Sequence, residues 1–247
     1  MSKKNTKIVL ILVAVFFLAA CGIEDVPFLY PIESNIQTSA ASSAVIRTPS
    51  ENDPTFTHFA VFYRIYSSHI STLDVSRPNF SLIHAQLNAD HNAVYPLTDI
   101  TTFIPRNMHD FFVRQRNFHV LEVEGERHIN AVLGNQNNIL GTTIRFDFPS
   151  WRNPYMTIRG TEYTLIRAQE PTIEADNRFF RNIPQLHDHN PLDARINADV
   201  ARIPPASLQA GAPINAYVAM YIVAVGMDGH SPVFSPPALI HVFRLPD

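Results

Sequence analysis

Residues 59–66 read Phe-Ala-Val-Phe-Tyr-Arg-Ile-Tyr, a run in which every residue is compatible with a β-strand. Alternate residues of a strand point to opposite faces, and both faces of this run are largely apolar. One face carries Phe59, Val61, Tyr63 and Ile65, and the other carries Ala60, Phe62, Arg64 and Tyr66. The run therefore predicts a central strand that is covered on both sides.

The C-terminal part of the chain continues the β pattern. Ala216 to Val225 forms a second long β run, Gly226 to Gly229 predicts a turn, and Ala238 to Phe243 predicts a final strand. The chain also has 19 Pro against only 8 Gly, and Pro interrupts both helices and central strands. We therefore expect a mainly β fold with many short strands.

These two ends resemble the fibronectin type III family. Thr48 to Pro54, followed by Phe59-x-Val61-x-Tyr63, is similar to the acidic, Pro-bearing B–C connection and C strand of that family. Val218 to Val225, then Asp228-Gly229 and Ser231-Pro232, is similar to its F strand, F–G turn and entry to strand G. The resemblance implies a fibronectin type III-like sandwich, and a generic antiparallel β-sandwich is the alternative.

The resemblance to the fibronectin type III family also implies that residues 45–70 and 208–247 form the two halves of the sandwich and that residues 71–207 form an inserted region. Alternating patterns make this region β-rich as well, with strands expected at Phe118 to Glu124 and Thr142 to Phe148. A hairpin is expected around Gly160. The best helix candidates are Asn79 to Ala89 and Met108 to Arg116, and Pro184 to Pro213 predicts an irregular return.

The N-terminus has the three parts of a signal peptide. Lys3, Lys4 and Lys7 precede an unbroken apolar stretch from Ile8 to Leu18, which small residues follow. Extended to Ala20, the stretch has 13 residues, whereas about 20 are needed for a helix to cross the hydrocarbon core. The segment therefore indicates a targeting sequence rather than a membrane span.

The leader ends in Leu18-Ala19-Ala20-Cys21, which contains the only cysteine of the chain. This ending resembles the lipobox of bacterial lipoproteins, and the resemblance implies that residues 1–20 are removed and that Cys21 carries lipid, including an acyl group such as palmitate. Residues 21–44 would then be a lipidated N-terminus and tether, with Phe28 to Tyr30 docked on the folded part. By the same resemblance, Gly22 favours the outer membrane over the inner one.

Processing also changes the charge of the protein. The leader holds all the lysines, so the chain from Cys21 onward has sixteen arginines against 22 acidic residues, a net charge of −6. Nucleic acid is excluded as a partner because a phosphate-binding surface needs a cationic excess. With Cys21 lipidated and no lysine left, thiol and Schiff-base catalysis are excluded too, and no cofactor is predicted.

The remaining candidates for metal or acid–base chemistry are weak. His187 and His189 have the spacing that places two imidazoles on one face of a strand, but a zinc site needs three or four ligands. Glu122, Glu124 and Glu126 alternate with apolar residues, which is typical of the solvated face of a strand. His230 and Ser231 lie together in an expected turn, where a loop hydrogen bond is the simpler interpretation.

The only tryptophan lies in a Pro-bounded segment that also contains Arg152 and Tyr155. Trp, Tyr and Arg dominate protein interfaces and can stack on sugars, so Trp151, Arg152 and Tyr155 form a candidate contact surface. The alternative is that the rings plug the end of the sandwich core.

Two functions follow from these observations. The first is a membrane-anchored envelope lipoprotein that is a non-enzymatic binding or scaffold module and contacts another envelope protein or a glycan. The second is a lipid-anchored hydrolase of envelope polymers that uses Asp/Glu or His-metal chemistry. The sequence favours the first, because an anchored β-sandwich with elaborated loops suits binding and the processed chain has neither a thiol nor a lysine nucleophile. A structure separates the two, since a hydrolase needs convergent acidic or histidine side chains and a binding module needs exposed aromatics.

Overall fold

The computed structural model describes residues 29–32, 37–40, 42–68, 89–90, 93–94, 107–124, 129, 132–149, 154–166, 200–202 and 215–244. Within these residues the protein is a mainly β, antiparallel sandwich, which confirms the predicted fold class. No helix of the described part is long and apolar enough to cross a membrane.

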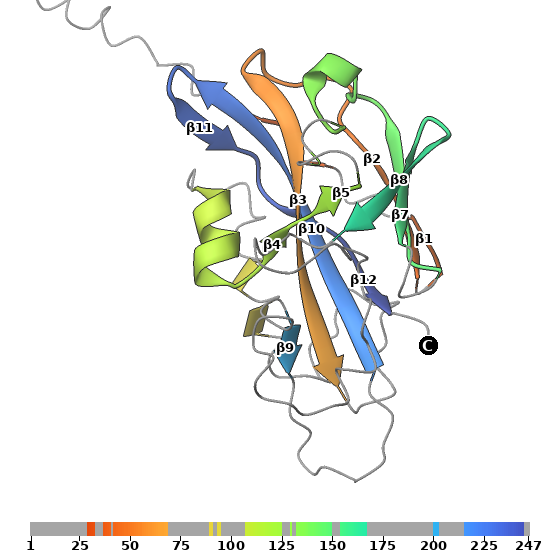
Figure 1. The fold of residues 1–247 in the computed structure, drawn as a ribbon. Helices are drawn as coiled ribbons and strands as arrows, with labels where there is room; N and C mark the ends of the chain where they lie inside the picture. The colour runs from red at the N-terminus through yellow and green to blue at the C-terminus, as the bar shows by residue number, and fades with distance from the viewer. Residues whose placement is uncertain are drawn as a thin grey trace, which may run out of the picture.

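Two long strands form the middle of one sheet, which we call sheet B. They are β3 (Phe56–Ser68) and β10 (Asn215–Asp228), antiparallel over their length from Asn215 opposite Ser68 to Gly226 opposite Phe56 (Figure 1). Both were predicted from their sequence. The turn lies later than expected, because β10 continues through Asp228 and the chain reverses at Gly229 and His230.

Shorter strands complete sheet B on both sides of this pair. On one side, β11 (Ser231–Phe234) and β12 (Ala238–Arg244) pair with successive parts of β10. On the other side, β4 (His119–Val120) is antiparallel to β3, and β9 (Val200–Arg202) is parallel to it. The predicted irregular return from Pro184 to Pro213 therefore contains a short strand.

The second sheet, sheet A, has the order β1-β2-β6-β7-β8-β5. Its strands are β1 (Gln37–Ala40), β2 (Ser43–Arg47), β5 (Glu122–Val123), β6 (Thr143–Asp147), β7 (Tyr155–Ile158) and β8 (Thr161–Ile166). The predicted hairpin is confirmed: β7 and β8 join at Arg159 and Gly160, which both have positive φ, as in a two-residue turn of type I′.

The strand predicted from Phe118 to Glu124 is divided between the two sheets. β4 pairs with β3 in sheet B, whereas β5 pairs with β8 in sheet A, and Leu121 between them donates its N–H to the Val61 carbonyl. Strands that change sheets make the corners of a sandwich. Together with β6 to β9, these strands come from residues 71–207, so this region completes both sheets in the described structure.

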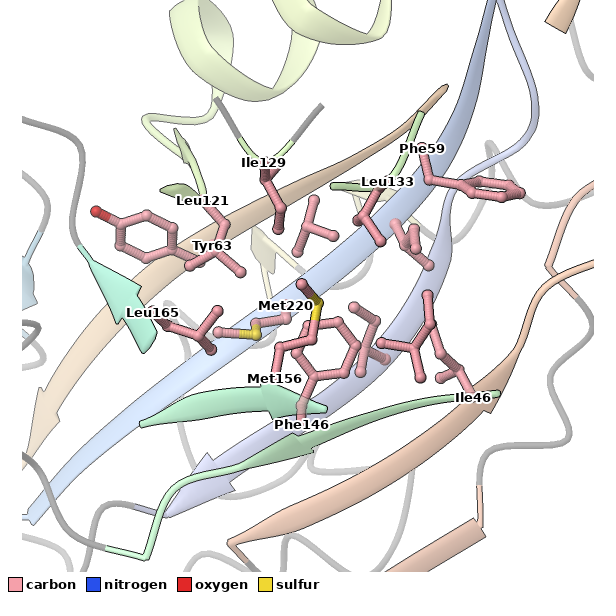
Figure 2. Close-up of a cluster of buried hydrophobic side chains, with 14 of the residues drawn as sticks. Ile46, Phe59, Tyr63, Leu121, Ile129, Leu133, Phe146, Met156, Leu165 and Met220 are labelled. Carbon is pink, nitrogen blue, oxygen red and sulfur yellow. The ribbon is translucent and has the colours of Figure 1, made fainter. Parts of the chain in front are cut away.

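The main core lies between the sheets (Figure 2). Sheet B contributes the first face of residues 59–66, and sheet A contributes the alternate apolar residues of β2, β6, β7 and β8. Side chains drawn from both sheets and from the connecting loops include Ile46, Tyr63, Leu121, Ile129, Leu133, Phe146, Met156, Leu165 and Met220. Each large apolar side chain buried here contributes about 1.5–3 kcal/mol.

A helical layer covers the opposite face of sheet B. It includes η2 (Asp110–Gln115), a short π-helix within the segment predicted as helix, and an aromatic cluster lies beneath it. Phe112 stacks on Phe62 with ring centroids 4.7 Å apart, and its edge meets Phe118. This layer explains why both faces of residues 59–66 are apolar. Of the other helix candidate, Asn79 to Ala89, only Ala89 is described.

The N-terminal segment docks on the sandwich. Leu29 and Ile32 are buried in the main core, and β1 pairs with β2. The docking expected for Phe28 to Tyr30 is therefore confirmed at Leu29, whereas Tyr30 is 49% exposed and Phe28 lies outside the described residues. The predicted tether of residues 21–44 thus contains a docked part and a strand.

Candidate contact surface

The outward face of sheet A is a polar surface supported by the main core. Ile144, Phe146 and Met156 point inward and are buried, so the residues between them point away from the core. Cross-strand pairing arranges the outward residues in rows, one of which is Val45, Arg145, Thr157 and Glu162. The next row is Ser43, Asp147, Tyr155 and Thr164. We call these eight residues the sheet A surface; Ser43 and Asp147 are its buried members.

An ion pair lies at the centre of the sheet A surface. Arg145 Nε donates to both carboxylate oxygens of Asp147, at 2.9 and 2.7 Å. The Asp147 side chain is 8% exposed, whereas that of Arg145 is 53% exposed. The hydrogen bond and charge of Asp147 raise the pKa of Arg145, with a smaller contribution from Tyr155. The surface therefore presents a fixed guanidinium beside a tyrosine ring.

Tyr155 is the one predicted contact residue that the structure describes. It is partly exposed, begins β7 and lies directly opposite Asp147 and Thr164. Trp151 and Arg152 lie outside the described residues, in the connection between β6 and β7. The ends of that connection are anchored, because Pro154 is buried and the Phe148 ring packs 4.5 Å from Phe243. Thus both chain ends of the Trp151 segment border the sheet A surface.

The predicted polar face of the Glu122 segment is confirmed where it is described. Leu121 and Val123 are buried, Glu122 is partly exposed and Glu124 is exposed. Glu126 lies outside the described residues. The two glutamates thus lie on the solvated side of a core strand.

Of the four residues named in the histidine candidates, the structure describes only His230 and Ser231. His187 and His189 lie outside the described residues, and His230 and Ser231 are exposed at the β10–β11 turn. Among the residues that are described, no group of three or more His, Cys, Asp or Glu could hold a metal ion.

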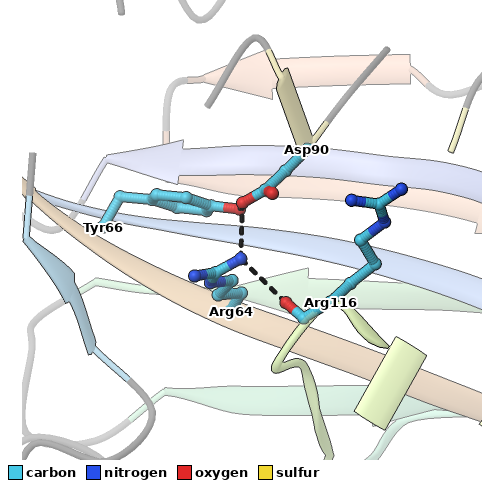
Figure 3. A network of polar contacts seen from close by, with 4 residues as sticks. All are labelled: Arg64, Tyr66, Asp90 and Arg116. Atoms are coloured by element: carbon cyan, nitrogen blue, oxygen red, sulfur yellow. Dashed lines mark hydrogen bonds and ion pairs between the residues drawn. The ribbon is translucent and has the colours of Figure 1, made fainter. Parts of the chain in front are cut away.

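A buried polar network lies on the helical side of sheet B (Figure 3). Arg64 Nη1 donates to Asp90 Oδ2 at 2.6 Å and to the Arg116 carbonyl at 2.7 Å, and the Tyr66 hydroxyl donates to Asp90 Oδ2 at 2.7 Å. Burial, followed by the charge of Asp90, raises the pKa of Tyr66 well above its ordinary value. Its phenol therefore remains a proton donor, and the network binds the helical layer to the sheet.

A buried histidine, His241, lies at the edge of the sandwich on β12. It is 6% exposed, and its Nε2 has no hydrogen-bond partner within the described residues. Its ring is perpendicular to that of Phe243, with ring centroids 5.1 Å apart. Burial lowers its pKa to about 4, so it is neutral at pH 7.

Three of these groups were not predicted from the sequence, and their sequence signals differ in strength. Arg145 and Asp147 are two residues apart on a predicted strand, so alternation could have paired them. Asp90 meets Arg64 across 26 residues of sequence, and no local pattern marks it. His241 stands in a strand whose alternation gives no sign that its ring is buried.

Comparison with known proteins assigns the chain to no family. No family model matches the chain, and no curated protein or solved structure matches it either. Its class is therefore defined by the fold alone, as a β-sandwich with a helical layer on one sheet and a polar outer face on the other.

Proposed function

We propose that this protein is a membrane-anchored lipoprotein of the bacterial cell envelope that works as a non-enzymatic binding or scaffold module. Lipid on Cys21 holds it on the outer membrane, facing the periplasm or the exterior. The sheet A surface, together with the Trp151 segment, contacts another envelope protein or a glycan. The proposed fibronectin type III-like character of the sandwich belongs to the same proposal.

The sheet A surface is the observation that carries this proposal. It combines an exposed arginine with a partly exposed tyrosine and two threonines on rigid strands. Arginine and tyrosine are enriched where proteins bind partners, and both stack on sugar rings. A site built on strands also loses little conformational entropy on binding.

The settings of Asp90, Asp147 and Glu124 support binding over hydrolysis. Asp90 and Asp147 are both buried, and an arginine side chain bonds each of them. Glu124 is exposed on the end of a core strand. Carboxylates held by charge-assisted hydrogen bonds to arginine are ion-pair partners within the fold, and these settings favour structural roles.

The experiment is photo-crosslinking in native envelopes. A photoreactive amino acid at Thr157, in the Arg145 row, should capture a partner that pull-down of the lipidated protein also recovers. Tyr155→Ala should reduce the crosslinked product severalfold by removing the ring beside Arg145. Arg114→Ala is the matched control, because the Arg114 side chain is exposed on the helical layer.

The anchor has its own test. Cys21→Ala should move the protein from the membrane fraction to the soluble fraction, since it removes every lipid chain. Retention in the membrane would reject lipidation. Equal crosslinking in wild type and Tyr155→Ala would reject the sheet A surface as the contact.

A further inference from the structure

The docked N-terminal segment meets the sandwich at the end where β3 begins. Leu29 and Ile32 are buried in the main core. The N–H of Tyr30 donates to Asn52 Oδ1 at 2.9 Å, in the loop that leads into β3. The chain that arrives from Cys21 is therefore fixed to this end of the molecule.

The β10–β11 hairpin lies at the same end (Figure 1). The N–H of Met227 donates to the Thr55 carbonyl at 3.0 Å, so the hairpin is joined to the loop that binds Tyr30. Tyr30 and Met227 are 49% and 42% exposed, and in the described part of the chain they are the exposed large hydrophobic residues. We call Tyr30, residues 51–55 and residues 227–232 the docking end.

Chain length places the docking end close to the lipid. Leu29 is eight chain steps from Cys21, and a fully extended chain covers at most about 3.3–3.6 Å per step, so the reach is at most about 28 Å. From Met227 to Asn215, β10 runs twelve residues at about 3.4 Å each, so the opposite end of the sheet lies about 40 Å away.

The chemistry of the docking end suits the headgroup region of a bilayer. Tyrosine is enriched at membrane interfaces, where its ring is partly apolar and its hydroxyl is hydrated. Glu51 and Asp228 are exposed and acidic, which disfavours deep insertion and contact with anionic lipid. A shallow contact with zwitterionic phospholipid fits both observations.

We infer that the docking end faces the membrane and that Tyr30 and Met227 contact phospholipid headgroups, with β3 and β10 directed away from the bilayer. This inference rests on the proposed lipidation of Cys21. It gives the module an orientation in which residues near Ser68 and Asn215 are presented far from the membrane.

Fluorescence quenching tests the orientation. The chain has no cysteine besides Cys21, so the lipidated variants Met227→Cys and Asn215→Cys each accept one thiol-reactive fluorophore. The labelled proteins are placed in phosphatidylethanolamine and phosphatidylcholine vesicles that carry a headgroup quencher. We expect the label at residue 227 to be quenched severalfold more than the label at 215, with unchanged thermal melting of both variants.

The outcomes separate the two proposals. Equal quenching at both positions, or stronger quenching at 215, in protein that stays on the vesicles would overturn the orientation and leave the anchor intact. The orientation would also be overturned if the lipid quencher had no effect on the label at residue 227 and native envelope proteins shielded that label instead. Failure of the lipidated protein to bind vesicles, with Cys21→Ala behaving identically, would overturn both.

Discussion

Arg64 and Asp90 form an ion pair of 2.6 Å between the central strand of sheet B and the segment packed on its outer face. Their side chains are 12% and 6% exposed, so the pair is largely excluded from solvent. The Tyr66 hydroxyl binds the same carboxylate oxygen. The helical layer is therefore held by an electrostatic contact in addition to the Phe62–Phe112 stack.

Asp90→Asn should destabilise the protein by about 3–5 kcal/mol, because it leaves the Arg64 guanidinium buried without a counter-charge. Chemical denaturation measures the loss of unfolding free energy. Asp110→Asn is the control. Asp110 Oδ1 lies 3.2 Å from Arg114 Nη1, and the Arg114 side chain is 80% exposed, so that change should cost no more than about 0.5 kcal/mol. Equal effects of the two variants would contradict the structural role of the network.

Thr48→Val should cost about 2–3 kcal/mol although the two side chains have the same shape. The Thr48 hydroxyl is buried, donates to the Ile139 carbonyl at 2.6 Å and accepts from the Thr142 N–H at 2.8 Å. Valine removes the hydroxyl and leaves buried backbone groups unpaired. Thr48→Ser keeps the hydroxyl and should cost about 1 kcal/mol for the lost methyl group. A serine variant less stable than the valine variant, by urea titration, would refute this reasoning.

Gly226→Ala should destabilise the β3–β10 pair by about 1–3 kcal/mol through overpacking. A Cβ at Gly226 would lie 2.8 Å from the Thr55 carbonyl oxygen, which is backbone and cannot rotate away. The control in the same hairpin is Gly229→Asn, because Gly229 has φ +57°, open space around it and a conformation that asparagine tolerates. Thermal melting should separate the variants. An unchanged stability of Gly226→Ala would show that the β3–β10 pairing, which has a register shift between Val225 and Gly226, moves to make room for the Cβ.

His241 should make the protein less stable in mild acid. Its pKa is about 4 in the folded protein and 6.5 ordinarily, so the fold favours the neutral ring. The resulting stabilisation is complete above pH 6.5 and is lost as pH falls from 6.5 to about 4, by about 3 kcal/mol.

Denaturation of wild type and His241→Phe at several pH values measures this contribution. As the pH falls below 6.5, wild type should lose stability relative to His241→Phe, because the variant has no imidazole to protonate. Burial also lowers the pKa of His58, but that contribution is common to both proteins and cancels. His230→Ala is the control at an exposed histidine, and a pH profile of His241→Phe parallel to wild type would contradict the prediction.

The main strands could be predicted because their signal is local. Residues 59–66 and 216–225 are long β-compatible runs, and Arg159-Gly160 sits between two alternating segments, so propensity and period agree. The candidate contact surface was predicted only at Tyr155. The Arg145–Asp147 ion pair could have been predicted from the same side-chain alternation, because both residues lie on one face of one strand.

Other features could not be predicted because they depend on pairing between distant segments. The Phe118 to Glu124 pattern looks like one strand, yet its two halves belong to different sheets, and only the positions of β3 and β8 decide where it divides. The same holds for Asp90, whose burial depends on the packing of a segment far along the chain.

The sequence alone determined that this is a mainly β chain with a doubly covered central strand, because side-chain alternation and β propensity act between near neighbours. It also contains the residues that resemble a lipobox at Cys21, a prediction that depends only on residue order. Tertiary structure alone decided that residues 71–207 complete both sheets, that Arg64 neutralises Asp90, and that Tyr30 and Met227 share one end of the molecule. Those relationships arise because residues that are remote in the sequence pair in strands or bury one another, and local sequence patterns do not predict such contacts.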